Sequence, residues 1–101
     1  MRIISKKTLV DFWNKYTDSE QSLKAWFSSA STASWKQPSD VKALYKNASI
    51  LKNNRVVFNI HGNKYRLIVK IDYQFGTLFI KFIGTHKQYD NIDANEVNYG
   101  N

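Results

Sequence analysis

The chain has 101 residues, a formal net charge of +7 and no cysteine. This length suits one hydrophobic core, so residues 1–101 are expected to form a single domain. The lack of cysteine excludes disulfides, thiolate nucleophiles and zinc fingers. No stretch reaches the roughly 20 apolar residues of a membrane span, and residues 1–7 lack the apolar run of a secretion signal. A cytoplasmic protein without membrane partners is therefore expected.

Residues 5–45 have the spacing of helices. Ser5 is expected to cap a first helix, and a second helix is expected to start at Ser19, because apolar residues recur at helical intervals after both positions. Pro38 should prevent the preceding helix from continuing, and Ser39 is expected to cap a short third helix. The helical residues expected to be buried are Leu9, Phe12, Trp13, Tyr16, Leu23, Trp26, Phe27 and Ala30.

From Arg55 the hydrophobic period changes to two, which predicts strands as far as residue 83. A first strand ends near Ile60, and Gly62-Asn63 forms a tight turn into a long second strand. One face of that second strand carries Tyr65, Leu67, Val69, Ile71 and Tyr73, and the other carries Lys64, Arg66, Lys70 and Asp72. A third strand follows the turn at residues 74–76, with Leu78, Ile80 and Phe82 expected to face away from Phe79, Lys81 and Ile83.

Helices followed by hairpin-linked strands predict an α+β fold. The N-terminal helices should pack on one face of a small antiparallel β-meander, with the other face partly open and a short helix at the C-terminal end. Residues 52–87 carry seven basic side chains and one acidic side chain, a balance of +6, whereas residues 88–101 carry three acidic and no basic side chains. The basic segment favours nucleic acid or an acidic protein as partner, and the open face is the expected functional face.

The basic side of the second strand is the first candidate site. Lys64 and Arg66 should point the same way, with Lys70 further along, because strand side chains repeat every two residues. Arginine binds a phosphate through two parallel hydrogen bonds, and lysine supplies a point charge. Lys81 interrupts the apolar third strand and would lie beside Lys70 if the charged faces align. Two structural explanations stay open, an ordinary solvated sheet face and a lysine that prevents edge-to-edge aggregation.

The segment after the third strand is the second candidate. His86, Tyr89 and Asp90 fall within one helical turn if residues 85–90 coil. An imidazole titrates near neutrality and acts as a base or an acid, and a phenol donates a proton. A surface or capping histidine explains the same pattern, so this alternative also stays open. His61 and His86 are the only histidines, and the carboxylates show no paired spacing, so no metal or cofactor is expected.

Two segments resemble the HigB-type toxins of the RelE/ParE superfamily. They are VFNIHGNKYRLI, residues 57–68, and IKFIGTHKQYD, residues 80–90. The resemblance spans nearly the whole chain, because a Lys-rich early helix, a Trp-containing middle and a Pro-initiated short helix precede them in the same order. It implies a RelE-like fold and the toxin of a type II toxin–antitoxin system.

The resemblance also implies an activity and partners. The implied activity is that of a metal-independent, ribosome-dependent endoribonuclease, which cleaves mRNA in the decoding site and so inhibits translation. The 2′-hydroxyl of the RNA would attack the adjacent phosphate. The protein partner would be a HigA-like helix-turn-helix antitoxin, and DNA would be reached only through the toxin–antitoxin complex.

The same resemblance implies roles for individual residues. His86 and Tyr89 would transfer protons, Arg66 and Lys64 would bind the phosphate, and Lys81 would contact the phosphate or the leaving group. Lys70 and Lys87 are expected to bind RNA phosphates, and Asp90 would orient His86 or cap the turn.

Two other functions would also explain the charge. A non-catalytic basic RNA- or DNA-binding module would keep its affinity without His86 and Tyr89. A ParE-like inhibitor of a protein target would share the fold but would not need the Arg66, His86 and Tyr89 side chains. The presence of the histidine and tyrosine together ranks the nuclease first.

Overall fold

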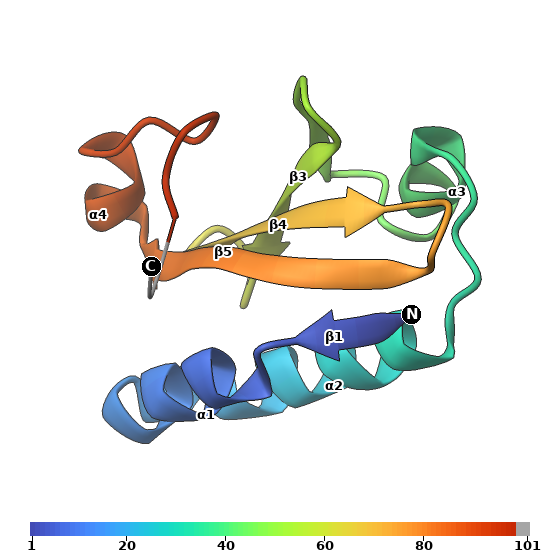
Figure 1. The fold of residues 1–101 in the computed structure, drawn as a ribbon. Helices are drawn as coiled ribbons and strands as arrows, with labels where there is room; N and C mark the ends of the chain where they lie inside the picture. The colour runs from blue at the N-terminus through green and yellow to red at the C-terminus, as the bar shows by residue number, and fades with distance from the viewer. Residues whose placement is uncertain (99–101) are drawn as a thin grey trace.

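A computed structural model describes residues 1–98 and has an α+β fold (Figure 1). Its strands are β1 (Arg2–Ile4), β2 (Ser49–Ile50), β3 (Arg55–Ile60), β4 (Tyr65–Asp72) and β5 (Thr77–Thr85). They form one sheet in the order β1-β5-β4-β3-β2. Strands β2 to β5 pair in antiparallel fashion, whereas β1 runs parallel to β5. The expected antiparallel meander is confirmed and is extended at both edges.

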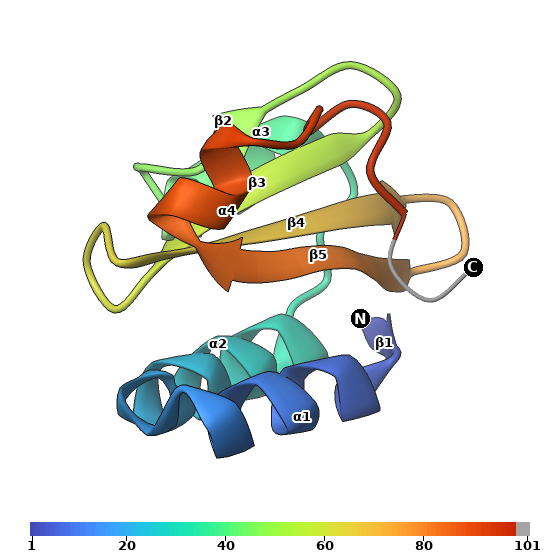
Figure 2. The ribbon, with the colours of Figure 1, turned by 90° about the vertical axis from the view of Figure 1, so that its left-hand side faces the viewer.

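The two long helices cover one face of this sheet. They are α1 (Lys6–Lys15) and α2 (Glu20–Thr32), joined by the 3-10 helix η1 (Thr17–Ser19). Two shorter helices follow, α3 (Pro38–Leu44) and α4 (His86–Asp90). Figures 1 and 2 show α1 and α2 side by side beneath the sheet and α4 on the opposite side. Within residues 1–98, no helix combines the length and the apolar character needed to cross a membrane.

The main hydrophobic core lies between the long helices and the sheet. Its members from α1 and α2 are Leu9, Phe12, Trp13, Leu23, Trp26 and Ala30, and its members from the central strands include Val56, Phe58, Leu67, Val69, Ile71 and Leu78. Tyr16 and Phe27, which were expected to be buried, pack against this core but remain partly exposed. The helical and strand periodicities therefore located the main core.

Three short elements differ from the sequence prediction: two strands were not predicted, and one helix begins at a different residue. Strands β1 and β2 were not predicted, because three and two residues are too few to show an alternating pattern. Pro38 starts α3 instead of preceding it, with Gln37 rather than Ser39 at the N-cap position. Proline is favoured at the first helical position, because its missing N–H has no helical partner there and its φ is already helical.

A β-bulge in β5 changes which side chains face the main core. Ile68 pairs with Phe82, but Val69 pairs with Ile80, so Lys81 has no residue opposite it in β4. The extra residue reverses the alternation beyond it. Ile83 therefore joins the main core and Phe82 lies on the second face. The expected facing of these two residues was wrong.

The second face of the sheet is partly covered by the C-terminal segment, residues 91–98. A second hydrophobic cluster consists of Val57, Ile68 and Phe82 on the sheet, with Leu51, Tyr89, Ile92, Ala94 and Val97 packed against it. Arg55 is buried at its edge and donates to the carbonyl oxygens of Ala94 at 3.0 Å and Val97 at 2.8 Å. The face expected to be open is therefore divided by the apolar strap, which consists of the side chains of Tyr89, Ile92, Ala94 and Val97 that pack on it.

Candidate active site

Helix α4 is fixed at the end of β5 by a capping box. The Thr85 hydroxyl accepts from the Gln88 amide at 3.1 Å, and the Gln88 side chain accepts from the Thr85 amide at 2.9 Å. The His86 amide donates to the carbonyl oxygen of Lys64 at 3.1 Å. These bonds hold the first turn of α4 against the turn between β3 and β4.

Arg66 lies beside this helix on the second face of β4. Its guanidinium carbon is 5.8 Å from the centre of the Tyr89 ring, and one of its nitrogens donates to the Asn63 carbonyl at 2.8 Å. Among the described residues, no carboxylate lies within ion-pair distance of Arg66. The guanidinium is thus oriented by neutral groups and keeps its charge available for an anion.

His86 is paired with a carboxylate of its own helix. Its Nδ1 lies 3.1 Å from the Asp90 Oδ2, and both side chains are more than half exposed. Tyr89 is partly buried in the second hydrophobic cluster. The expected contact between Asp90 and His86 is present, and the structure brings His86, Tyr89 and Arg66 to one corner of the sheet.

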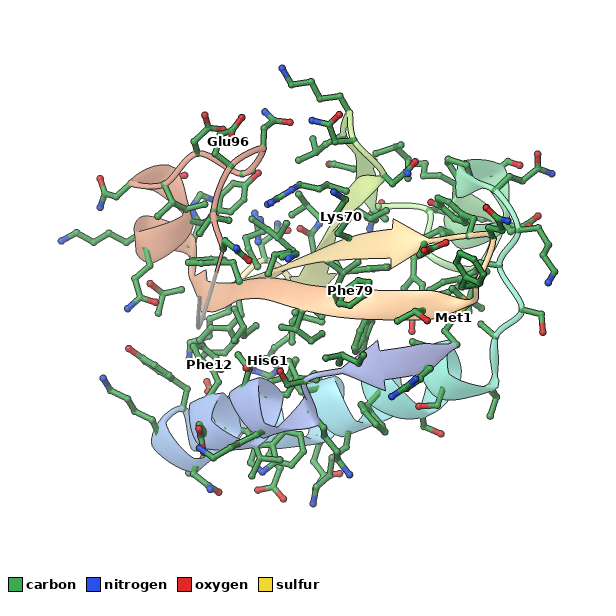
Figure 3. The ribbon with its side chains drawn as sticks, viewed as in Figure 1. Met1, Phe12, His61, Lys70, Phe79 and Glu96 are labelled. Atoms are coloured by element: carbon green, nitrogen blue, oxygen red, sulfur yellow. The ribbon has the colours of Figure 1, made fainter. Side chains whose placement is uncertain are left out.

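The side chain of Lys64 does not join these three residues, although its backbone carbonyl bonds to the His86 amide. It belongs to the turn before β4, so the strand alternation that would align it with Arg66 does not apply. Its amine forms an ion pair with Asp18 of η1, which also accepts a hydrogen bond from the Tyr65 hydroxyl. Figure 3 shows His61, from the same turn, on the helix side of the sheet. Asp18 is 46 residues from Lys64 in sequence, so local spacing gave no signal of this contact.

The Asp18 pair makes stability sensitive to acid. Hydrogen bonds from Lys64 and then Tyr65 hold the pKa of Asp18 below its ordinary value of 3.8. The carboxylate therefore stabilises the fold fully above pH 3.8, and this stabilisation is lost as pH falls through the lowered pKa. We expect Asp18→Asn to lower the urea midpoint at neutral pH and to remove this part of the acid sensitivity. Asp11→Asn, at an exposed carboxylate, is the control. Equal acid sensitivity in the parent and Asp18→Asn would contradict this assignment.

Lys70 and Lys81 lie together beyond the apolar strap, beside a cavity of about 450 Å³. The Lys81 amine donates to the side-chain oxygen of Asn98 at 3.0 Å. Burial, with smaller effects from Arg55 and Lys70, lowers the pKa of Lys81. The expected proximity of Lys81 to Lys70 is present, whereas Arg66 pairs with Gly84, three residues beyond Lys81.

The remaining candidates give a mixed result. Lys87 is exposed on α4, with a backbone carbonyl that accepts from Asn91. Within residues 1–98, no three His, Asp or Glu side chains gather into a metal-binding group. Sequence reasoning missed Arg55, whose only signal was its place in the basic segment, and Phe79, which was assigned a face but no role.

Comparison with known proteins assigns the chain to a family. Residues 19–92 match the HigB_toxin family, the RelE-like toxic component of a toxin–antitoxin system. The chain belongs to this family. The match runs from the end of η1 past α4, so it includes Arg66, His86 and Tyr89, and it confirms the resemblance seen in the sequence.

Named relatives are similar over nearly their full length. The chain is 28% identical to the mRNA interferase toxin HigB of Escherichia coli K12 over 96 residues, which cover 93% of this chain and 92% of the relative. The mRNA interferase HigB of Shigella flexneri gives the same identity and coverage. That of Escherichia coli O6:H1 is 26% identical over 94 residues, 91% of each chain.

Proposed function

We propose that this chain is an mRNA interferase, a toxin–antitoxin endoribonuclease that cleaves mRNA without a metal and so inhibits translation. The observation that carries the proposal is the corner where Arg66, which has no carboxylate partner within residues 1–98, lies against Tyr89 beside the His86–Asp90 pair. The names of the similar HigB proteins support the activity. We extend the proposal to cleavage in the ribosomal decoding site by one domain that comprises residues 1–101, of which 99–101 lie outside the described residues.

The proposed reaction is an internal transesterification. The 2′-hydroxyl oxygen bonds to the adjacent phosphorus, the bond from phosphorus to the 5′-oxygen breaks, and the products are a 2′,3′-cyclic phosphate and a 5′-hydroxyl. One proton leaves the 2′-hydroxyl and one reaches the 5′-oxygen, so a base and an acid are needed. An imidazole that donates its Nδ1 proton to Asp90 leaves Nε2 free to accept a proton. His86 is then the base and Tyr89 the acid.

Arg66 stabilises the charge that develops on the phosphate. Its fixed, planar set of donors matches two phosphate oxygens, and a donor oriented before the reaction stabilises the transition state more than one that must reorganise. Lys87, exposed on α4, contacts the RNA backbone near this corner. Lys64 reaches RNA only after it releases Asp18, because its amine is already paired.

The proposed protein partner is a HigA-like helix-turn-helix antitoxin, which would carry any contact with DNA. The balance of +6 over residues 52–87 supports this partner, since an acidic surface would cover the basic face that RNA uses. A cytoplasmic location follows from the substrate, because mRNA on ribosomes is found there.

The proposal is tested by induced expression in a host without the antitoxin. Translation rate and the new 5′ ends of mRNA are measured for the parent and for His86→Asn, Tyr89→Phe and Arg66→Ala. The parent should stop translation and create new 5′ ends, and the three variants should lose them. His61→Asn is the matched control, because asparagine tolerates the positive φ of 55° at that turn. Growth arrest without mRNA cleavage would overturn the proposal and favour a protein target.

A further inference from the structure

Three cationic side chains, those of Arg55, Lys70 and Lys81, gather on the second face of the sheet. Lys70 of β4 and Lys81 of the β5 bulge line the cavity described above, and Arg55 and Lys70 both lie close enough to Lys81 to add to the lowering of its pKa by burial. Among the described residues, no carboxylate lies within ion-pair distance of any of the three. Asp72 also lines the cavity, but its carboxylate accepts from the Phe75 amide at 3.0 Å. Mutual repulsion among these cations favours the binding of an anion.

An aromatic ring lies next to these cations. Phe79 pairs with Lys70 across the sheet, and the Lys81 amine is 5.7 Å from the centre of its ring. Figure 3 shows Lys70 and Phe79 on the adjacent strands β4 and β5. Phe79 is partly exposed and belongs to neither hydrophobic cluster. A cationic groove with a stacking surface is the arrangement that binds single-stranded RNA.

This group is separate from the corner that holds Arg66. Lys81 and Gly84, the partner of Arg66, are three residues apart on β5, or about 10 Å. Between them, Phe82 and Ile68 carry the apolar strap. The strap prevents one phosphate from bridging the two groups, so an anion at Lys81 must be a different one.

We propose that Lys70, Lys81 and Phe79 form a second RNA subsite, which binds a phosphodiester of the mRNA strand away from the scissile bond and stacks its base on Phe79. This inference rests on the proposed function, because it takes the RNA strand to continue from the Arg66 corner. In the free protein the Lys81 amine donates a hydrogen bond to the side-chain oxygen of Asn98. The RNA phosphate replaces this oxygen as the acceptor. Lys81 then serves strand binding and is not a catalytic residue.

The subsite is tested with the full chain and a single-stranded RNA of about ten nucleotides, 2′-O-methylated throughout to block cleavage. The measurement is the Kd as a function of salt. Lys70→Ala combined with Lys81→Ala should reduce the slope of log Kd against log salt by about 0.7 for each phosphate that the variant no longer neutralises. Phe79→Ala should raise Kd about tenfold. The control with equal charge loss, Lys36→Ala combined with Lys46→Ala at two exposed lysines, should keep the parent slope.

A second measurement separates this inference from the proposed function. On ribosomes programmed with unmethylated RNA, the Lys70/Lys81 double variant should need a higher toxin concentration than the parent for half-maximal cleavage, whereas the Lys36/Lys46 control should match the parent. A parent that cleaves and a double variant with unchanged affinity and slope would overturn the subsite alone. Loss of affinity for mRNA-free ribosomes or for the antitoxin, with oligonucleotide affinity unchanged, would also overturn it. A parent that cleaves no RNA would overturn the proposed function, and the subsite with it.

Discussion

Replacing Arg66 with alanine is expected to slow single-turnover cleavage by about 100- to 1000-fold, the usual effect of removing one oriented donor from a charged transition state. The side chain is oriented by the Asn63 carbonyl and the Tyr89 ring, and none of the carboxylates in the described part of the chain is close enough to neutralise it. Arg66→Lys should recover only part of the rate, because an ammonium keeps the charge but not the planar pair of donors. The rate is measured on programmed ribosomes with toxin in excess over RNA.

The control for this experiment is Arg2→Ala, which removes an exposed arginine from the edge strand β1, where it pairs with the first residue of β5, whereas Arg66 pairs with Gly84 near the end of that strand. It should cleave at the parent rate. Urea unfolding of each variant establishes that the loss is not caused by unfolding. An Arg66→Ala protein that is folded and cleaves as fast as Arg2→Ala would remove Arg66 from the reaction.

Periodic sequence features were sufficient to predict most of the fold. The helices before residue 33 and the three long strands repeat apolar residues over enough turns to fix which side is buried. Strand β1 could not be found in this way, because its three residues acquire their structure from pairing with β5, more than 70 residues later. The bulge at Lys81 could not be predicted from the sequence either, because it depends on how β5 pairs with β4 and not on the order of residues within β5.

For the candidate site too, local spacing predicted some contacts, and contacts between distant segments were missed. His86, Tyr89 and Asp90 are neighbours within one helical turn, so their spacing predicted their proximity once residues 85–90 were taken as a helix. Lys64 was grouped with Arg66 by strand alternation, but a distant carboxylate, Asp18, holds it on the helix side. The cover over the second face was missed because residues 91–98 are mostly polar, and only Ile92, Ala94 and Val97 pack onto the sheet.

Gly84→Ala is expected to reduce stability by about 1–3 kcal/mol, the usual cost of an added methyl group in a filled space. A Cβ at this position would contact the Phe82 ring, with one ring carbon 2.9 Å away, and would lie 2.8 Å from the Gln88 side-chain oxygen. Gln88 closes the capping box of α4 and Phe82 supports the apolar strap. The substitution should therefore also displace His86 and Tyr89 and slow cleavage in the folded protein.

A double-mutant cycle with Phe82→Leu separates the two contacts. Leucine removes the ring atoms that the new Cβ would meet, so Gly84→Ala should cost less in the Phe82→Leu background than in the parent, by about 0.5–3 kcal/mol of coupling. The contact with Gln88 remains in both backgrounds, so the cleavage defect should persist after stability has partly recovered. Unfolding free energies that simply add would show that the ring does not exclude a side chain here. Stability and cleavage that recover together would show that Gln88 does not transmit the effect to α4.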